Sequence, residues 1–234
     1  MRVLLTRAKE DAARSAASLA ALGHESIVSP VIEIIGLPAK LPAQQVDAVV
    51  ATSAHAFASV DVRELSYTPL YVVGERTREA ARRVGWNAPI HVSENAKALI
   101  VFLRVDSPDT RSVLYLAGDH RKPDIEAAAR EIGLGLEVVE TYVAREILSL
   151  SEESERALRA GALDGVLHYS RRSAELFIAL TQRAELWVEA AKLRHFALSP
   201  DVAEPLATAG ARIHVAAHPD EDHLFALLTD ADRG

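Results

Sequence analysis

The sequence predicts an α/β fold with parallel β-sheets that carry helices on both faces. One observation is the alternation of short apolar segments with longer, alanine-rich segments of helical periodicity along the 234 residues. The other is a repeat, because Asp47-Ala-Val-Val-Ala-Thr-Ser53 returns as Asp164-Gly-Val-Leu-His-Tyr-Ser170. Each copy joins an acidic residue to an apolar run typical of a buried parallel strand. Each ends in a serine that can cap the next helix or bind a ligand.

Turn residues divide the chain into strands and helices. Gly23 and Gly85 end two helices, Pro30 ends a strand, and Pro123 suits the first turn of a helix. Strands are expected at 3–6, 26–29, 31–35, 46–51, 70–73, 90–92, 113–116, 136–146, 165–169, 195–198 and 213–215. Helices are expected at 9–22, 54–60, 77–85, 96–103, 124–132, 151–160, 172–181, 186–192, 201–210 and 223–229.

The repeat extends over most of the chain. Residues 113–116 resemble 3–6, and residues 213–215 resemble 90–92. Residues 74–85 and 199–210 have the same spacing between a turn and a final glycine. We name the segments that contain residues 3–6, 47–92, 113–116 and 164–215 a, b, a′ and b′, in their order along the chain. Two sequential domains would pair a with b, whereas a discontinuous arrangement would pair a with b′ and leave b with a′ in the middle. The periodicity alone does not choose between these arrangements.

The composition, with 49% hydrophobic and 25% charged residues, is typical of a globular protein. The absence of cysteine excludes disulfides and thiolate metal sites. No apolar run reaches the ~18 residues that a membrane-spanning helix needs, and the first residues predict a strand rather than a signal peptide. The net charge of −7 argues against a general nucleic-acid binder. We therefore expect a cytoplasmic protein without membrane or nucleic-acid partners.

Polar and small residues gather where the predicted strands end. In open parallel sheets, ligands bind beyond these carboxyl ends, and helix amino ends favour carboxylates and phosphates. Each residue also has a purely structural interpretation as a helix cap. Their equivalent positions in both copies favour one cleft for a polyanion. The positions are Thr6, Arg7, Thr52, Ser53, Gly74 to Thr77, Gly118 to Lys122, Ser170, Arg171 and Ser199 to Asp201.

Other motifs give little support for specific chemistry. The chain has no G-x-G-x-x-G after a strand, no Walker loop and no G-x-S-x-G elbow. His218 and His223 flank Pro-Asp-Glu-Asp, a spacing that favours a solvated turn over a metal site. His91 and His214 are expected to be half-buried strand residues. Tyr142 stands in an apolar strand, where it is either a packed aromatic or a functional group.

Six short stretches share a common order and spacing along nearly the whole chain. Together they resemble the uroporphyrinogen-III synthase family of tetrapyrrole biosynthesis. They are Val3-Leu-Leu-Thr-Arg7, Thr52-Ser-Ala54, Val73-Gly-Glu-Arg-Thr77, Val113-Leu-Tyr-Leu-Ala-Gly118, Thr141-Tyr-Val143 and Ser170 with its strand.

The resemblance implies two flavodoxin-like, three-layer α/β domains joined by a two-stranded β-ladder. The first domain would combine residues 1–30 with 150–234, and the second would be residues 45–140. Residues 31–44 and 141–149 would connect them, with 31–35 paired against 142–147. Two covalent crossings would form a hinge that bends without separating the domains.

The resemblance also implies an enzyme that converts hydroxymethylbilane, a linear tetrapyrrole with eight carboxylates, to uroporphyrinogen III. The reaction loses water, passes through a spiro intermediate and inverts ring D, and it needs no metal and no organic cofactor. Tyr142 would be catalytic, assisting departure of the hydroxyl group, and the enzyme would be a monomer. The substrate-binding residues would be Thr6, Arg7, Thr52, Ser53, Gly74, Thr77, Gly118, Ser170, Arg171 and Ser199.

One departure from the family pattern concerns Ser199-Pro200-Asp201, where the family commonly has Gly-Pro-Thr. We expect the carboxylate of Asp201 to compete with a substrate carboxylate for the helix amino end. This departure slightly favours an alternative function, a non-catalytic hinged tetrapyrrole carrier or sensor. The presence of Tyr142 and Thr77 favours the enzyme.

Overall fold

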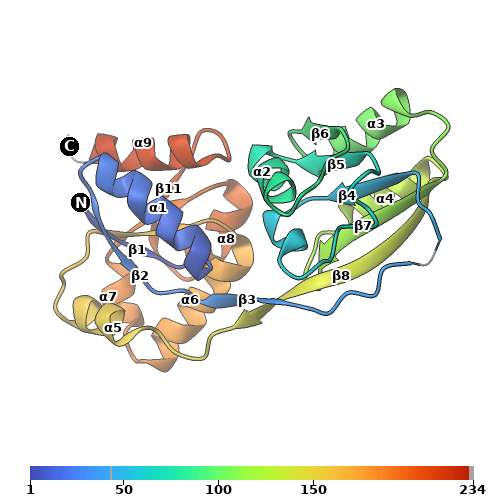
Figure 1. Cartoon of the computed structure of the whole chain (residues 1–234). Helices are drawn as coiled ribbons and strands as arrows, with labels where there is room; N and C mark the ends of the chain where they lie inside the picture. Colours follow the sequence, from blue (N-terminus) through green and yellow to red (C-terminus); the bar gives the residue numbers. More distant parts are fainter. Residues whose placement is uncertain (43, 232–234) are drawn as a thin grey trace. The chain divides into compact units, whose positions relative to one another are not determined.

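The computed structural model describes residues 1–42 and 44–231, and it divides the chain into two compact units (Figure 1). The first unit contains Met1–Glu33 and Arg145–Gly234, and the second contains Ile34–Ala144. Ala43, in the segment expected to connect the domains, and residues 232–234 lie outside the described residues. In the described part of the chain, no helix is both long enough and apolar enough to cross a membrane.

The first unit is built on a five-stranded sheet in the order β11-β10-β9-β1-β2. Every strand pair described in it is parallel, with Val3 opposite Gly165 and Ser26 in register. The central strand β9 is buried along its whole length. The strands are β1 (Arg2–Leu5), β2 (Glu25–Val28), β9 (Gly165–His168), β10 (Arg194–Ala197) and β11 (Arg212–Val215).

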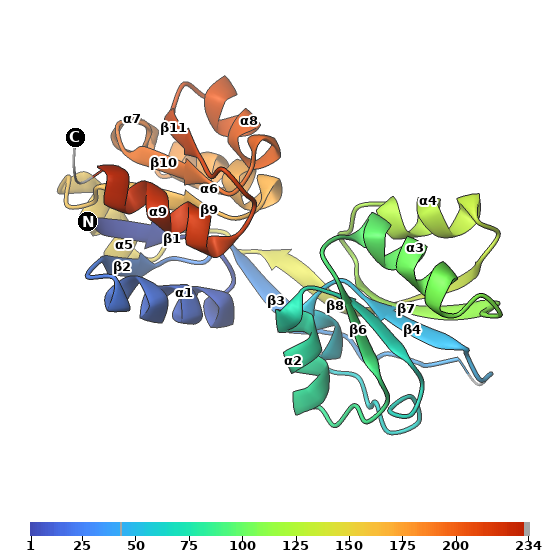
Figure 2. The same ribbon diagram turned by 90° about the horizontal axis from the view of Figure 1, so that it is seen from above.

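Helices cover both faces of this sheet, as the two views show (Figures 1 and 2). Val3 and Leu5 point to α1 (Lys9–Ala21) and α9 (Glu221–Ala231), and Leu4 points to the other face. This alternation follows from the two-residue period of a strand. The helices on the face of Leu4 are α5 (Glu152–Arg159), α6 (Arg171–Arg183), α7 (Trp187–Ala191) and α8 (Pro200–Thr208).

The second unit is built on a six-stranded sheet in the order β3-β8-β7-β4-β5-β6. The pairs from β8 to β6 are parallel. The edge strand β3 lies beside β8, where the amide of Leu37 donates to the carbonyl of Thr141 at 2.8 Å. The strands are β3 (Ile32–Gly36), β4 (Ala48–Ala51), β5 (Leu70–Val73), β6 (Ile90–Ser93), β7 (Ser112–Gly118) and β8 (Gly135–Glu146).

The second sheet also lies between two helical layers. Val49 packs with the 3-10 helix η1 (Ala54–Phe57) and with α2 (Glu75–Arg83). Val50, on the opposite face, packs with α3 (Ala96–Asp106) and α4 (Asp124–Glu131). The prediction of parallel sheets with helices on both faces is therefore confirmed.

The strand order confirms the internal repeat. Read from its β2 edge, the first sheet runs β2-β1-β9-β10-β11, and the parallel part of the second runs β8-β7-β4-β5-β6. Strands β1 and β7, β9 and β4, and β11 and β6 therefore hold equivalent places. These are the pairs of segments whose sequences resemble one another.

The prediction of a helix over residues 54–60 is wrong. Only the 3-10 helix Ala54–Phe57 forms, and the chain then continues as turns and loop to Leu70. Val60, Val62 and Leu65 are buried in this irregular segment and join the apolar core under the sheet. The packing of these three side chains in the core, rather than helix formation, determines the conformation of this segment.

Candidate functional site

The first unit brings five of the predicted binding residues to one edge of its sheet. Thr6 and Arg7 follow β1, Ser170 and Arg171 follow β9, and Ser199 follows β10. Since β1, β9 and β10 are adjacent and parallel, their carboxyl ends lie side by side. These five residues therefore lie at one edge of the first sheet.

The hydroxyl groups at this edge have partners within the protein. Ser170 Oγ accepts from the amide of Ser173 at 3.1 Å, and Ser199 Oγ accepts from that of Val202 at 3.4 Å. Each serine therefore caps the helix that follows it. Thr6 is fully buried, and its hydroxyl donates to the carbonyl of Leu167 at 3.2 Å.

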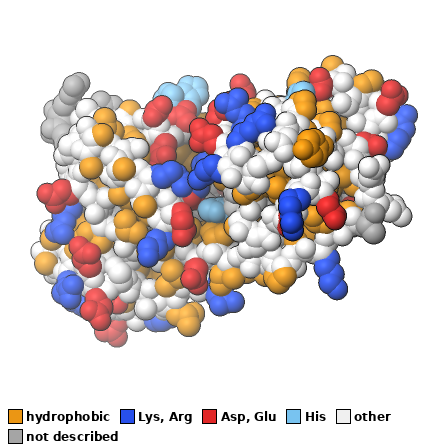
Figure 3. All heavy atoms as spheres, viewed as in Figure 1, with side chains coloured by type: hydrophobic (Ala, Val, Ile, Leu, Met, Phe, Trp, Pro, Cys, Tyr) orange, Lys and Arg blue, Asp and Glu red, His pale blue; other side chains and the backbone are white. Residues whose placement is uncertain are grey.

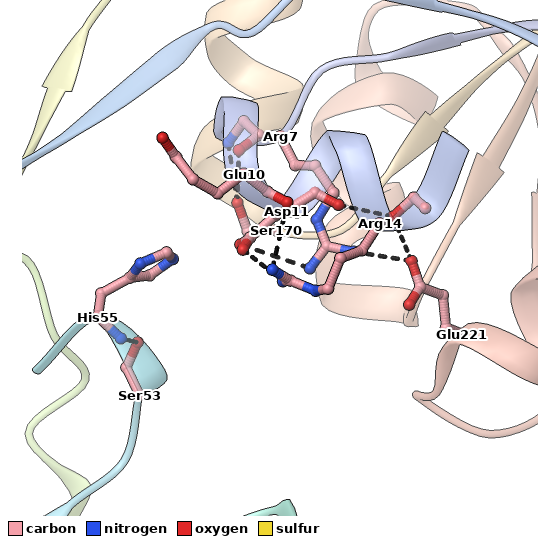
Figure 4. A network of polar contacts seen from close by, with 10 residues as sticks. Arg7, Glu10, Asp11, Arg14, Ser53, His55, Ser170 and Glu221 are labelled. Carbon is pink, nitrogen blue, oxygen red and sulfur yellow. Dashed lines mark hydrogen bonds and ion pairs between the residues drawn. The ribbon is translucent and has the colours of Figure 1, made fainter. Parts of the chain in front are cut away.

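Arg7 stands in a network of polar contacts (Figure 4). Its Nη1 donates to Glu221 at 2.8 Å and to Ser15 at 2.9 Å, and its Nη2 lies 3.6 Å from Asp11. The guanidinium also lies 3.9 Å above the ring of Tyr169. Two carboxylates of the protein thus already balance the charge of Arg7.

Arg171 is also paired within its own unit. Its guanidinium lies 3.0 Å from Glu175 and 3.6 Å from Asp201, and it contacts Glu204. Because of this contact, Arg171 partly neutralises the carboxylate of Asp201. On the face shown in Figure 3, basic and acidic side chains are interspersed.

The second unit collects a second set of predicted residues at the carboxyl edge of its sheet. Gly118 ends β7, Thr52 and Ser53 follow β4, and Gly74 and Thr77 follow β5. Gly74 has φ +76° and begins α2, so its left-handed backbone favours glycine. Thr77 is buried, and its amide donates to the carbonyl of Gly74 at 3.1 Å.

Tyr142 lies among these residues, on β8 opposite Gly118. Burial raises the pKa of the Tyr142 phenol, a hydrogen bond with Ser53 opposes this shift, and the charge of Asp119 adds to it. The net upward direction keeps the phenol protonated at neutral pH. Ser53 Oγ also accepts from the amide of His55 at 3.3 Å, and the rings of His55 and Tyr142 are 5.7 Å apart.

A second tyrosine reaches the same edge. The hydroxyls of Thr52 and Tyr115 are 2.9 Å apart, and burial raises the pKa of Tyr115. Tyr115 was not identified from the sequence, because an aromatic residue inside a buried strand gives no sign of a polar partner. His55 was also missed, although its position after Thr52-Ser-Ala54 could have suggested it.

The histidine residues that raised the question of a metal have other contacts. His223 Nδ1 lies 2.7 Å from Asp220, and the ring of exposed His223, in the first turn of α9, is 4.6 Å from that of exposed His218. Within residues 1–42 and 44–231, no group of three or more His, Asp or Glu side chains could hold a metal ion. The prediction that His91 and His214 are half-buried strand residues is confirmed.

Two solved structures resemble the whole chain. Uroporphyrinogen-III synthetase from Helicobacter pylori has a TM-score of 0.66 and 15% identity, over 99% of this chain and 100% of that one. A mutant uroporphyrinogen III synthase from the extremely thermophilic bacterium Thermus thermophilus has a TM-score of 0.57 and 17% identity, over 100% of this chain and 99% of that one. At this identity the likeness shows the α/β fold alone.

Sequence comparison identifies the family. Among curated proteins, no sequence matches the chain significantly. A family model described as uroporphyrinogen-III synthase HemD, however, matches residues 13–226. This match covers most of the chain, which therefore belongs to the uroporphyrinogen-III synthase family, whose members are lyases that cyclise hydroxymethylbilane.

Proposed function

We propose that Tyr142 is the proton donor when the protein cyclises hydroxymethylbilane to uroporphyrinogen III. The observation that carries this proposal is the half-buried phenol at the carboxyl edge of the second sheet, which stays protonated at neutral pH. Ser53 Oγ already accepts the amide of His55, so its own proton can be donated to the phenol oxygen. The proton of Tyr142 is then available for the departing hydroxyl, which leaves as water.

The remaining chemistry depends on the conformation in which the substrate is held. Loss of water leaves an azafulvene cation, and ring closure through the spiro intermediate inverts ring D. Closure also occurs spontaneously and then gives the uninverted isomer. The enzyme must therefore fix the geometry of the chain more than it must supply strong acids.

We propose that the carboxyl edges of both sheets contribute groups that bind substrate carboxylates. The proposed binding residues are Thr6, Arg7, Thr52, Ser53, Gly74, Thr77, Gly118, Ser170, Arg171 and Ser199. The amino ends of α2, α6 and α8 support this proposal, since helix amino ends attract anions. Buried Thr6 and Thr77 would contribute through their backbone positions.

Isomer analysis of the product tests this function. With hydroxymethylbilane, we expect the type III isomer in excess over the spontaneous, uninverted isomer. A product mixture equal to that of the reaction without protein would contradict the proposal. It would also favour the alternative of a non-catalytic tetrapyrrole carrier or sensor, which the family match does not favour.

We further propose that residues 31–44 and 141–149 form a hinge between a domain of residues 1–30 and 150–234 and a domain of residues 45–140. The proposal rests on the pairing of β3 with β8, since the chain passes between the two units only at residues 33–34 and 144–145. We expect small-angle scattering to show a smaller radius of gyration with product than without it. Equal radii in the two states would count against a closing hinge.

Replacing Asp201 with Asn tests its competition with substrate. The change removes a negative charge at the amino end of α8, while Arg171 keeps Glu175 and Glu204 as partners. We expect the KM for hydroxymethylbilane to fall roughly 2- to 5-fold, which corresponds to the usual effect of one charge at a helix end. A control is Asp109→Asn on the exposed surface of the second unit. An unchanged or higher KM in Asp201→Asn would show that this carboxylate does not compete.

We also propose that the enzyme is a cytoplasmic monomer. A sequence without cysteine is compatible with a reducing compartment. Light scattering in solution should give the mass of one chain, and a mass of two or more chains would contradict the monomer.

A further inference from the structure

The segment Gly118-Asp119-His120-Arg121, here called the 118–121 turn, begins at the last residue of β7 and contacts β8 on both sides of Tyr142. The amide of Asp119 donates to the carbonyl of Tyr142 at 3.1 Å. The amide of Ala144 donates to Asp119 Oδ1 at 3.2 Å. Asp119 therefore fixes the backbone of β8 at Tyr142 and two residues beyond it.

Arg121 fixes the other side of this turn. Its Nη1 donates to the carbonyl of Gly118 at 2.9 Å and to Glu140 Oε1 at 3.0 Å. Its Nε donates to Glu126 at 2.7 Å. One guanidinium thus connects the start of the turn to β8 two residues before Tyr142. A bidentate or branched arginine contact of this kind restricts both partners.

The strand register changes at the same place. Ala117 pairs with Glu140, whereas Gly118 pairs with Tyr142, so Thr141 is an additional residue on β8. Such a β-bulge redirects side chains and occurs next to active sites. The hydroxyl of Thr141 donates to the carbonyl of Ala117 at 3.3 Å, so the bulge has its own hydrogen bond.

Gly118 provides the space that the Tyr142 ring occupies. A Cβ atom at Gly118 would lie 2.6 Å from Cζ and 2.9 Å from the hydroxyl oxygen of Tyr142. The φ angle of Gly118 is outside the left-handed region, so its backbone does not itself require glycine. The requirement for glycine therefore comes from the phenol.

From these contacts we infer that the 118–121 turn is a positioning element for the Tyr142 phenol, with Gly118 and Asp119 as its positioning residues. Gly118 then acts through the tyrosine, in addition to its proposed place among the substrate-binding residues. This inference rests on the proposed role of Tyr142 as proton donor. The turn sets where the phenol stands, and misplacement of a reacting group by about 1 Å can reduce a rate by roughly 100-fold.

Three substitutions test the inference. Gly118→Ala fills the space under the ring, Asp119→Ala removes the acceptor for the amide of Ala144, and Asp119→Asn keeps an oxygen in that place. We expect kcat to fall about 10- to 100-fold in the two alanine variants, with KM changed less than about twofold. Asp119→Asn should stay near the wild type, because the acceptor and not its charge is required. Asp109→Ala, at an exposed position, is the matched control.

A double variant separates positioning from general damage. Gly118→Ala should add no further loss to Tyr142→Phe, because the hydroxyl that it misplaces is already absent. A fully additive loss in the double variant would overturn the inference. Wild-type kcat in Gly118→Ala, or equal damage in Asp119→Asn and Asp119→Ala, would also overturn it.

A readout without substrate distinguishes this inference from the proposed function. The chain has five tyrosines, so the ¹³Cζ resonance of Tyr142 can be assigned by comparison with Tyr142→Phe. In Gly118→Ala we expect this resonance to move and its titration to shift towards the ordinary pKa of ~10. An unmoved resonance overturns the inference even if the wild type is active. If the wild-type protein does not give the type III isomer in excess, the proposed function fails. The resonance of Tyr142 still shows whether the 118–121 turn positions the phenol. Circular dichroism monitors folding, and Asp119→Ala provides the test if Gly118→Ala does not fold.

Discussion

Replacing Tyr142 with Phe is expected to lower kcat about 100-fold, near the lower end of the range for general acid assistance. The change keeps the ring over Gly118 and removes only the hydroxyl, whose pKa burial raises. The loss corresponds to about 3 kcal/mol of transition-state stabilisation. It is expected at the lower end because water can replace the phenol as donor, whereas the conformation of the bound chain directs ring closure.

The type III isomer should remain the main product of Tyr142→Phe, since the binding residues are unchanged. Rate and isomer ratio, measured together from hydroxymethylbilane, check this prediction. Tyr67→Phe is the matched control, because the side chain of Tyr67 is 80% exposed in the same unit. Loss of isomer control without loss of rate would mean that Tyr142 shapes the substrate. If neither the rate nor the isomer ratio changes, Tyr142 is a packed aromatic residue without a catalytic role.

The sequence predicts the sheets well because their central strands, such as β4 and β9, are buried on both faces. Such strands read as continuous apolar runs, and the repeat provides a second copy for comparison. The segment after Ser53 is different. Ser53 signals a helix start, but Val60, Val62 and Leu65 are buried in an irregular loop by long-range packing. Local propensity does not contain that information.

The edge of each sheet is also predictable, since polar residues follow parallel strands at equivalent places. The contacts of those residues are not. Glu221 is separated from Arg7 by 214 positions along the chain, and nothing near either residue indicates that they pair. Interpreted from sequence alone, Arg7 is a free cation at a strand end, whereas the structure surrounds it with protein carboxylates.

The position of Tyr142 depends on a feature that the sequence pattern obscures. The sequence predicts one extended strand over 136–146, but Thr141 forms a bulge opposite Ala117 and Gly118. The bulge places Tyr142 over a glycine that the family resemblance assigned to substrate binding. Because one additional residue changes the register, the neighbour of a strand residue follows only from the three-dimensional pairing.

A pair of buried histidines leads to the second prediction with a large effect, which concerns stability. His168 on β9 and His195 on β10 are both fully buried, and His168 Nε2 lies 3.0 Å from His195 Nδ1. His195 Nε2 donates to the carbonyl of Ala190 at 3.0 Å, so its Nδ1 is the acceptor of the His168 proton. His168 Nδ1 then keeps a lone pair with no partner among the described residues. Both rings are neutral in this arrangement.

Burial lowers the pKa of His195 to about 4, and burial and the neighbouring ring lower the pKa of His168. In the unfolded chain each histidine titrates near ~6.5. Below that pH the unfolded state binds protons that the folded state does not, so folding stability falls as the pH falls from ~6.5 towards the folded pKa. Between pH 7 and pH 5 the expected loss from His195 is about 2 kcal/mol, and His168 adds a loss in the same direction.

Urea denaturation of the wild type and of His195→Gln at pH 7 and pH 5 measures this effect. Glutamine can make both hydrogen bonds of His195 but does not titrate, so its variant should lose about 2 kcal/mol less than the wild type between the two pH values. Leu148→Gln is the control, because Leu148 is 74% exposed in the same unit and has no titratable group, so this variant should retain the wild-type dependence. The comparison uses only the change with pH, so a constant cost of the substitution does not affect it. Equal pH dependence in the wild type and His195→Gln would mean that the buried pair accepts a proton without unfolding.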